Sequence, residues 1–272
     1  MSGLDDVLKA IPIQGPLQMA YFWLKNRKRA KQHRKWAKSN GMQFALTGKS
    51  FEAPANPHTS DGAELAGEKP LSSQQQKYAR MFGSSKIQSQ YGQFISNRFR
   101  GEWQTDKNIC WGSWKGYTVI TWDTVFYDFV AATGQDLDWS EGEYSSVLIL
   151  TDTPLHRTLI TPKKLWKRLA SFGIEEGSSL RLKNVEFELD SFNKQYQVKS
   201  NDPKWAFAII DQGMMEWLMQ QQLQHGIEIN SGGIMVSTWF TMAPKQVEEQ
   251  LDACVKFLEH IPDDLKHATE SG

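Results

Sequence analysis

Two residues separate two long strand-like segments in the middle of this 272-residue chain. Asn108–Trp114 and Tyr117–Phe129 are rich in Trp, Tyr, Val, Ile and Thr, which favour extended backbone. Only Lys115 and Gly116 lie between them, and a two-residue connection is typical of a tight β-hairpin. The sequence therefore predicts an antiparallel pair at this point.

Further segments extend the pattern of short strands and intervening helices. Expected strands are Ser145–Thr151, His156–Thr161, Val185–Leu189, Gln195–Lys199, and a hairpin of Ile227–Ile229 with Ile234–Phe240. Expected helices begin at Pro16, at Pro162, after Asp202, after Asp211 and near Pro244. Repeated βαβ units are missing from this order, so we predict an α+β fold of antiparallel sheets with packed helices, preceded by a basic amphipathic N-terminal helix.

Composition divides the chain into five predicted parts. Residues 1–47 form the N-terminal basic helix segment, and 48–100 form a loop-rich linker with Pro54, Pro57 and Pro70, in which Gln74–Phe82 is a helix candidate. Residues 101–174 form a β-rich half, 175–262 an α+β half, and 263–272 a tail.

Positive charge is concentrated in the first part. No acid lies between Asp6 and Glu52, and ten Lys and Arg residues there balance an equal negative excess elsewhere. A helix beginning at Pro16 would be apolar through Leu24 and basic beyond it. The predicted membrane- or anion-binding residues are Tyr21, Phe22, Trp23, Lys25, Arg27, Lys28, Arg29, Lys31, Arg34, Lys35 and Lys38.

This arrangement favours an anionic membrane surface as the partner. The apolar stretch is too short and too broken by prolines to span a bilayer, and the first residues lack the features of an export signal. We therefore expect a cytoplasmic protein that is peripheral on the inner face of the cell membrane. One alternative is that Leu17–Leu24 packs on the sheet, with the lysines as a solvated extension. Another is nucleic-acid binding by the basic helix, although its aromatic residues are not interleaved with the charges. A protein partner and the oligomeric state stay open.

Signatures of catalysis are weak, and the sequence predicts no catalytic residues, no metal ligands and no cofactor. The adjacent glycines at 232 and 233 fit a hairpin turn better than a phosphate loop. Two cysteines and six scattered histidines do not form a zinc pattern. A triad of Cys110, His156 and Asp152 would need geometry that sequence proximity does not supply. The main hypothesis is a non-enzymatic accessory or scaffold protein, with an enzyme of unrecognised site as an alternative.

The segment Phe187–Leu218 carries a resemblance to a bacterial, actinobacterial-type family of membrane-associated proteins of unknown function. The matching residues are Phe192, Asn193, Tyr196, Val198, Asp202, Ala206, Met214, Met215, Glu216, Trp217 and Leu218. Trp36–Gly41 and Phe257–Pro262 also resemble that family. The resemblance implies association with a membrane and supplies no activity to transfer. Members commonly carry hydrophobic membrane segments before the basic run, and this chain departs from them there.

Overall fold

The structure is a computed structural model. It describes residues 16–52, 54, 103–130, 138–152, 155–164, 182–221, 223, 225–230, 232–238 and 240–266. The candidate helix Gln74–Phe82 lies outside these residues.

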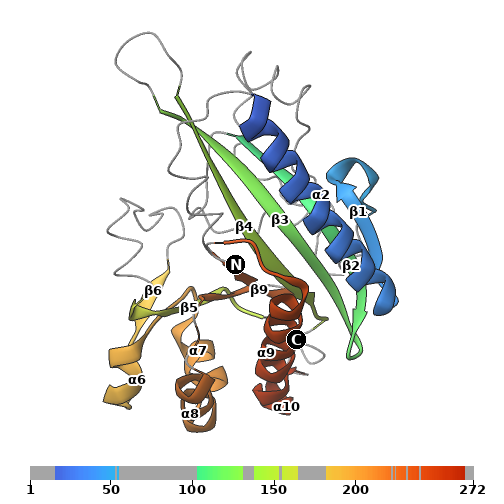
Figure 1. Cartoon of the computed structure of the whole chain (residues 1–272). Helices are drawn as coiled ribbons and strands as arrows, with labels where there is room; N and C mark the ends of the chain where they lie inside the picture. The colour runs from blue at the N-terminus through green and yellow to red at the C-terminus, as the bar shows by residue number, and fades with distance from the viewer. Residues whose placement is uncertain are drawn as a thin grey trace, which may run out of the picture.

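The described strands form one nine-stranded sheet in which every neighbouring pair is antiparallel (Figure 1). The spatial order is β1-β2-β3-β4-β9-β8-β5-β7-β6. The strands are β1 (Gln43–Thr47), β2 (Trp103–Trp114), β3 (Tyr117–Val130), β4 (Asp138–Leu150), β5 (Thr158–Pro162), β6 (Lys183–Val185), β7 (Tyr196–Ser200), β8 (Ile227–Asn230) and β9 (Gly233–Ser237). The pairing of β4 with β9 joins strands from the two predicted halves of the chain.

Both predicted hairpins are confirmed. β2 and β3 meet at Lys115 and Gly116, whose φ angles of 49° and 89° are both positive. Positive φ at both central residues is what a two-residue turn needs to match the twist of its strands, and glycine adopts it without strain. β8 and β9 pair in the same way around Gly232. The prediction of an α+β chain with antiparallel strands and an N-terminal helix therefore holds.

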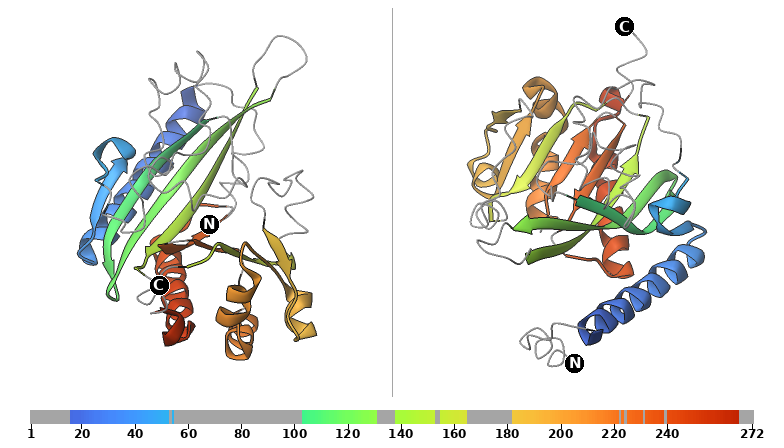
Figure 2. Two further views of the ribbon diagram at one scale, coloured as in Figure 1. Left: turned by 180° about the vertical axis from the view of Figure 1, so that it is seen from behind. Right: turned by 90° about the horizontal axis from the view of Figure 1, so that it is seen from above.

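Helices lie against the sheet at both ends (Figures 1 and 2). They are α2 (Pro16–Ser39), the short η1 (Gly48–Ser50), α6 (Asp190–Gln195), α7 (Pro203–Ile209), α8 (Gln212–Gln221), α9 (Pro244–His260) and α10 (Asp263–Lys266). One apolar core joins Trp36 of α2, Val147 of β4, Leu218 of α8 and Leu251 of α9. A second cluster, which includes Ile120 and Leu148, lies on the opposite face of the sheet.

Several elements differ from those expected, and β1 and α6 were not predicted. The strand predicted at Val185–Leu189 is wrong, since β6 ends at Val185, the residue where that strand was expected to begin. The Asn193 carboxamide bonds both the N–H and the carbonyl of Phe187 and leads the chain into α6. Pro162 is the last residue of β5 instead of opening a helix. Lys163 and Lys164 that follow are helical, and the rest of that predicted helix lies outside the described residues. β9 ends at Ser237, short of the expected Phe240.

The predicted cap of α7 is present. Asp202 Oδ1 accepts hydrogen bonds from the backbone N–H groups of Lys204 at 3.0 Å and Trp205 at 3.2 Å, ahead of Pro203 at the first helical position. We expect Asp202→Ala to lower the free energy of unfolding by about 1 kcal/mol, measured by urea denaturation. Asp202→Asn keeps a capping oxygen and loses the charge that faces His156, so it should stay close to wild type. Equal losses in both variants would assign the effect to the His156 contact and contradict the cap.

Candidate functional site

The basic residues of α2 divide between two sides of the helix. His33, Trp36 and Ala37 are buried against the rest of the molecule. The exposed cations, apart from Arg34, are Lys25, Arg27, Lys28, Lys31, Lys35 and Lys38. Four of them, spaced three or four residues apart, define the basic stripe: Lys28, Lys31, Lys35 and Lys38. That spacing places them along one face of the helix, opposite the buried residues.

Apolar and aromatic residues adjoin the basic stripe. Leu24 lies one turn before Lys28 and is 58% exposed, so a large apolar side chain stands in line with the lysines. Tyr21, Phe22 and Trp23 belong to the helical backbone of α2, and their side chains lie outside the described part of the structure. Their role in membrane contact stays a prediction.

Arg34 and Arg29 of the predicted set contact the protein itself. Arg34 holds its guanidinium carbon 5.1 Å from the centre of the Phe44 ring, a cation–π contact with β1. Arg29 lies on the buried side of α2 and pairs with Asp123 of β3 through two hydrogen bonds of 2.6 Å. Arg29 is therefore an internal anchor and differs in environment from the basic stripe.

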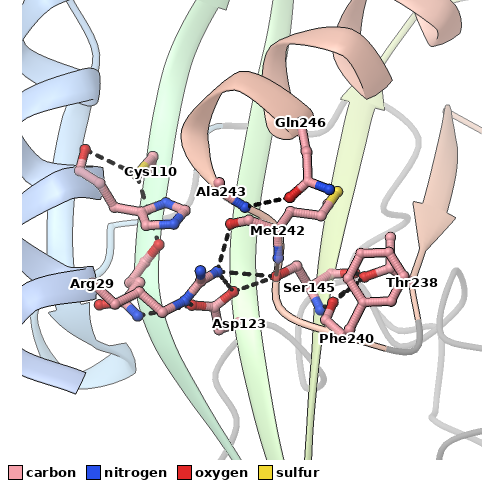
Figure 3. Close-up of polar contacts among 11 residues, drawn as sticks. Arg29, Cys110, Asp123, Ser145, Thr238, Phe240, Met242, Ala243 and Gln246 are labelled. Atoms are coloured by element: carbon pink, nitrogen blue, oxygen red, sulfur yellow. Dashed lines mark hydrogen bonds and ion pairs between the residues drawn. The ribbon is translucent and has the colours of Figure 1, made fainter. Parts of the chain in front are cut away.

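Asp123 is the centre of a buried polar cluster that we call the α2 clamp (Figure 3). Its members are Arg29, Asn108, Asp123, Ser145 and the carbonyl of Met242. Besides the Arg29 pair, Asp123 accepts hydrogen bonds from the Asn108 carboxamide at 2.8 Å and from the Ser145 hydroxyl. Arg29 also donates to the Met242 carbonyl at 2.8 Å, and the Met242 N–H donates to Ser145 Oγ at 2.7 Å. The clamp thus fastens α2 to β2, β3, β4 and the segment before α9.

A β-bulge brings Asn108 into the α2 clamp. The β2–β3 register shifts between the pairs Lys107↔Asp123 and Cys110↔Thr121, so two residues of β2 stand opposite one of β3. Asn108 has a φ of 52°, a left-handed conformation that Asn tolerates better than most residues. The extra residue therefore turns its carboxamide toward Asp123.

The short segment after β9 completes the attachment. Ser145 and Thr238 exchange backbone and side-chain hydrogen bonds, and the Ser145 N–H also reaches the Phe240 carbonyl at 3.2 Å. The hydroxyl of Thr238 donates to the carbonyl of Phe240 as well. These bonds divert the chain from the β4–β9 ladder and explain why β9 ends at Ser237. They also position Met242 over Ser145 for the clamp.

A second attachment of α2 involves the tryptophans Trp36 and Trp114. The Trp36 indole donates to Glu248 at 2.7 Å, and the Trp114 indole donates to Asp252 at 2.8 Å. The two acids lie four residues apart on α9, and the two indole rings are 6.3 Å apart. These contacts tie α2 and the β2–β3 hairpin to one face of α9.

The cysteines of the described residues are both buried and unreactive. Burial raises the pKa of Cys110 to about 12 and that of Cys254 to about 12. The thiolate is the nucleophile in cysteine catalysis, so neither thiol is activated at neutral pH. The residues considered as a triad are not assembled, because Cys110 lies beneath α2 while His156 faces Asp202 and the Trp205 ring.

Sequence reasoning missed the acceptor side of the clamp. The available signal was Asp123 itself, a lone acid within the apolar run Val119–Val125, since Asp is rarely buried unless it is paired. Its partner could not be chosen, because Arg29 is one of eight cations between Lys25 and Lys38. Within the described residues, His, Cys, Asp and Glu side chains form no group able to hold a metal ion.

Comparison with known proteins finds little similarity. No model of a protein family matches the sequence, and no curated protein matches it. Among solved structures, the mycobacterial trehalose monomycolate transport factor A, TtfA, matches with a TM-score of 0.44 and 11% identity, over 89% of this chain and 96% of that chain. A match this weak carries no argument about fold or function.

Proposed function

We propose that this protein is a non-catalytic accessory protein that attaches reversibly to an anionic membrane surface through the exposed side of α2. The observation that carries the proposal is the placement of the basic stripe, which faces away from the sheet while Arg29 turns inward to Asp123. An acid-free, lysine-rich helix face is suited to lipid headgroups. The expected place is the cytoplasmic face of the inner membrane.

The energetics fit dissociable attachment. Each Lys or Arg near an anionic leaflet contributes up to about 1 kcal/mol, less where neighbouring charges share the same lipids and salt screens them. The four lysines of the basic stripe therefore supply a few kcal/mol. Leu24, exposed in line with the stripe, adds apolar contact at the depth of the headgroups. Among helices of the described residues, none is both long and apolar enough to cross a bilayer.

The α2 clamp supports the proposal because it holds α2 rigidly against the sheet. It holds α2 by a bidentate ion pair and two further acceptors, so the basic stripe keeps one orientation relative to the sheet. A surface that is already oriented loses less conformational freedom on binding than a flexible tail would. Membrane contact would therefore fix the orientation of the sheet and of α6–α9 as well.

The proposal is tested by comparing how tightly the intact chain binds to anionic and to neutral vesicles. We expect binding to vesicles that mix phosphatidylglycerol with phosphatidylcholine, and none to phosphatidylcholine alone, by co-sedimentation at about 0.1 M salt. Binding should weaken steeply as salt rises, because exposed charges are screened. Equal binding to both vesicles would contradict an electrostatic attachment. Tighter binding to duplex DNA than to anionic vesicles would favour the nucleic-acid alternative.

A further inference from the structure

The joint between α2 and the sheet contains a buried histidine without hydrogen-bond partners. His33 is 2% exposed and lies one turn after Arg29 on the docked side of α2. Neither ring nitrogen has a hydrogen-bond partner in the part of the chain that the structure describes. Most buried polar side-chain atoms are paired, so an imidazole left unpaired at a helix–sheet contact needs an explanation.

The surroundings of His33 are poorly suited to a second positive charge. Arg29 approaches from α2 itself, and Asp123 from β3 is the acid whose charge acts on the ring. The carboxylate of Asp123 is already engaged by Arg29, Asn108 and Ser145.

Among the described residues, the other elements around the joint supply no free acid. From β2, the Cys110 thiol lies against the His33 carbonyl, and from α9, Glu248 accepts the Trp36 indole. The Met242 carbonyl lies near enough to favour the protonated ring, yet it already accepts from Arg29. An imidazolium would therefore share one carboxylate with a guanidinium.

We propose that His33 makes the docking of α2 pH-dependent, so that protonation of its ring releases α2 from the sheet. Release would break the α2 clamp and the Trp36–Glu248 bond, and it would uncover Cys110 together with the part of the main core that Trp36 and Ala37 cover. Cys254, on α9, would stay covered by the remaining members of that core. The inference does not rest on membrane binding, because release can be measured in solution without lipid.

The direction of the pH effect follows from the two states of the helix. Burial lowers the pKa of docked His33 below its ordinary 6.5, Asp123 opposes that shift, and Arg29 adds to it. In the released helix, His33 returns to solvent and to about 6.5. The released state then binds more protons below that pH, so acid favours it. The released fraction should rise about tenfold per pH unit while docked His33 stays neutral.

Cys110 provides the measurement. Both thiols are buried in the main core, but the Cys110 sulfur lies 3.9 Å from the His33 carbonyl oxygen of α2, whereas Cys254 lies on α9. The intact chain is reacted with 4,4′-dithiodipyridine, and each cysteine is quantified by peptide mass spectrometry. Dividing each rate by that of the denatured chain at the same pH removes the intrinsic pH dependence of the thiol. We expect the corrected Cys110 rate to rise from about pH 7.5 to about pH 5.5, by up to about tenfold, with Cys254 unchanged.

Two variants separate His33 from other acid effects. His33→Gln is neutral at both pH values, so its Cys110 rate should not respond. His225→Gln is the matched control, because His225 is also buried, with a pKa lowered to about 4 by burial, and contacts Phe240 outside α2. This variant should keep the wild-type response. A response of wild-type size in His33→Gln, its loss in His225→Gln, or a parallel rise at Cys254 would overturn the proposal. If His33→Gln fails to fold, the two wild-type thiols still distinguish local release from global unfolding.

Discussion

Replacing Asp123 by alanine should lower the free energy of unfolding by about 3–5 kcal/mol. The substitution leaves the Arg29 guanidinium, whose side chain is 13% exposed, without its counter-charge. It also removes the acceptor of Asn108 and Ser145 in the same buried volume. Uncompensated buried charge is among the few single-residue changes that cost this much. Equilibrium urea denaturation followed by tryptophan fluorescence would measure the loss.

Two comparisons test whether the loss comes from the stranded charge. The double variant Arg29→Met/Asp123→Leu removes both ions and should recover a large part of the stability, because a buried pair can often be replaced by apolar residues. Glu249→Ala breaks an exposed ion pair with Lys245 at 3.9 Å and should cost well under about 1 kcal/mol. A double variant no more stable than Asp123→Ala would show that the Asn108 and Ser145 bonds, instead of the charge, dominate the clamp.

Local sequence signals predicted the elements that adjacent residues decide, whereas β1 and α6 were not predicted. The β2–β3 hairpin follows from Lys115-Gly116, and the start of α7 follows from Asp202-Pro203, because each feature is decided by residues adjacent in the chain. The predicted strand Val185–Leu189 was wrong, because only Val185 belongs to β6. Alternation continues through Phe187 and Leu189, while the Asn193 carboxamide that diverts the backbone gives no signal of its own.

The sequence predicted only the exposed part of the site, which is the basic stripe. The basic stripe is visible as composition, whereas the inward turn of Arg29 depends on an acid 94 positions away. No periodicity links Arg29 to Asp123, and β-bulge positions such as Asn108 carry no reliable sequence mark. His33 was equally hidden, because a histidine within a run of cations resembles another surface residue. The roles of Arg29, Asn108 and His33 depend on contacts between segments far apart in the chain, and local sequence propensity does not reveal such contacts.

The docking of α2 also determines how its function should be tested. Trp36 and Ala37 belong to the main core, so removing residues 1–40 would damage the fold together with any binding surface. Substitutions confined to the basic stripe avoid that problem. Its lysines are exposed, and exposed side chains usually change stability by less than about 0.5 kcal/mol.

Changing Lys28, Lys31, Lys35 and Lys38 together to Gln should weaken binding to anionic vesicles about 100-fold. Four lysines at somewhat under 1 kcal/mol each account for a loss of that size, since about 1.4 kcal/mol is a factor of ten. Gln keeps the helix propensity of α2 close to that of Lys, so docking on the sheet should persist. Vesicle co-sedimentation at about 0.1 M salt measures the affinity, and the urea midpoint should match that of wild type.

The matched control removes the same charge elsewhere. Lys183, Lys194, Lys204 and Lys245 are exposed on β6, α6, α7 and α9, so their change to Gln lowers the net charge equally while leaving α2 intact. If α2 is the contact, this variant should bind within about twofold of wild type, because charges beyond one Debye length of the lipid surface contribute little. Equal losses in the two variants would mean that net charge alone drives the association. Unchanged binding in the stripe variant would exclude α2 as the membrane-contacting surface.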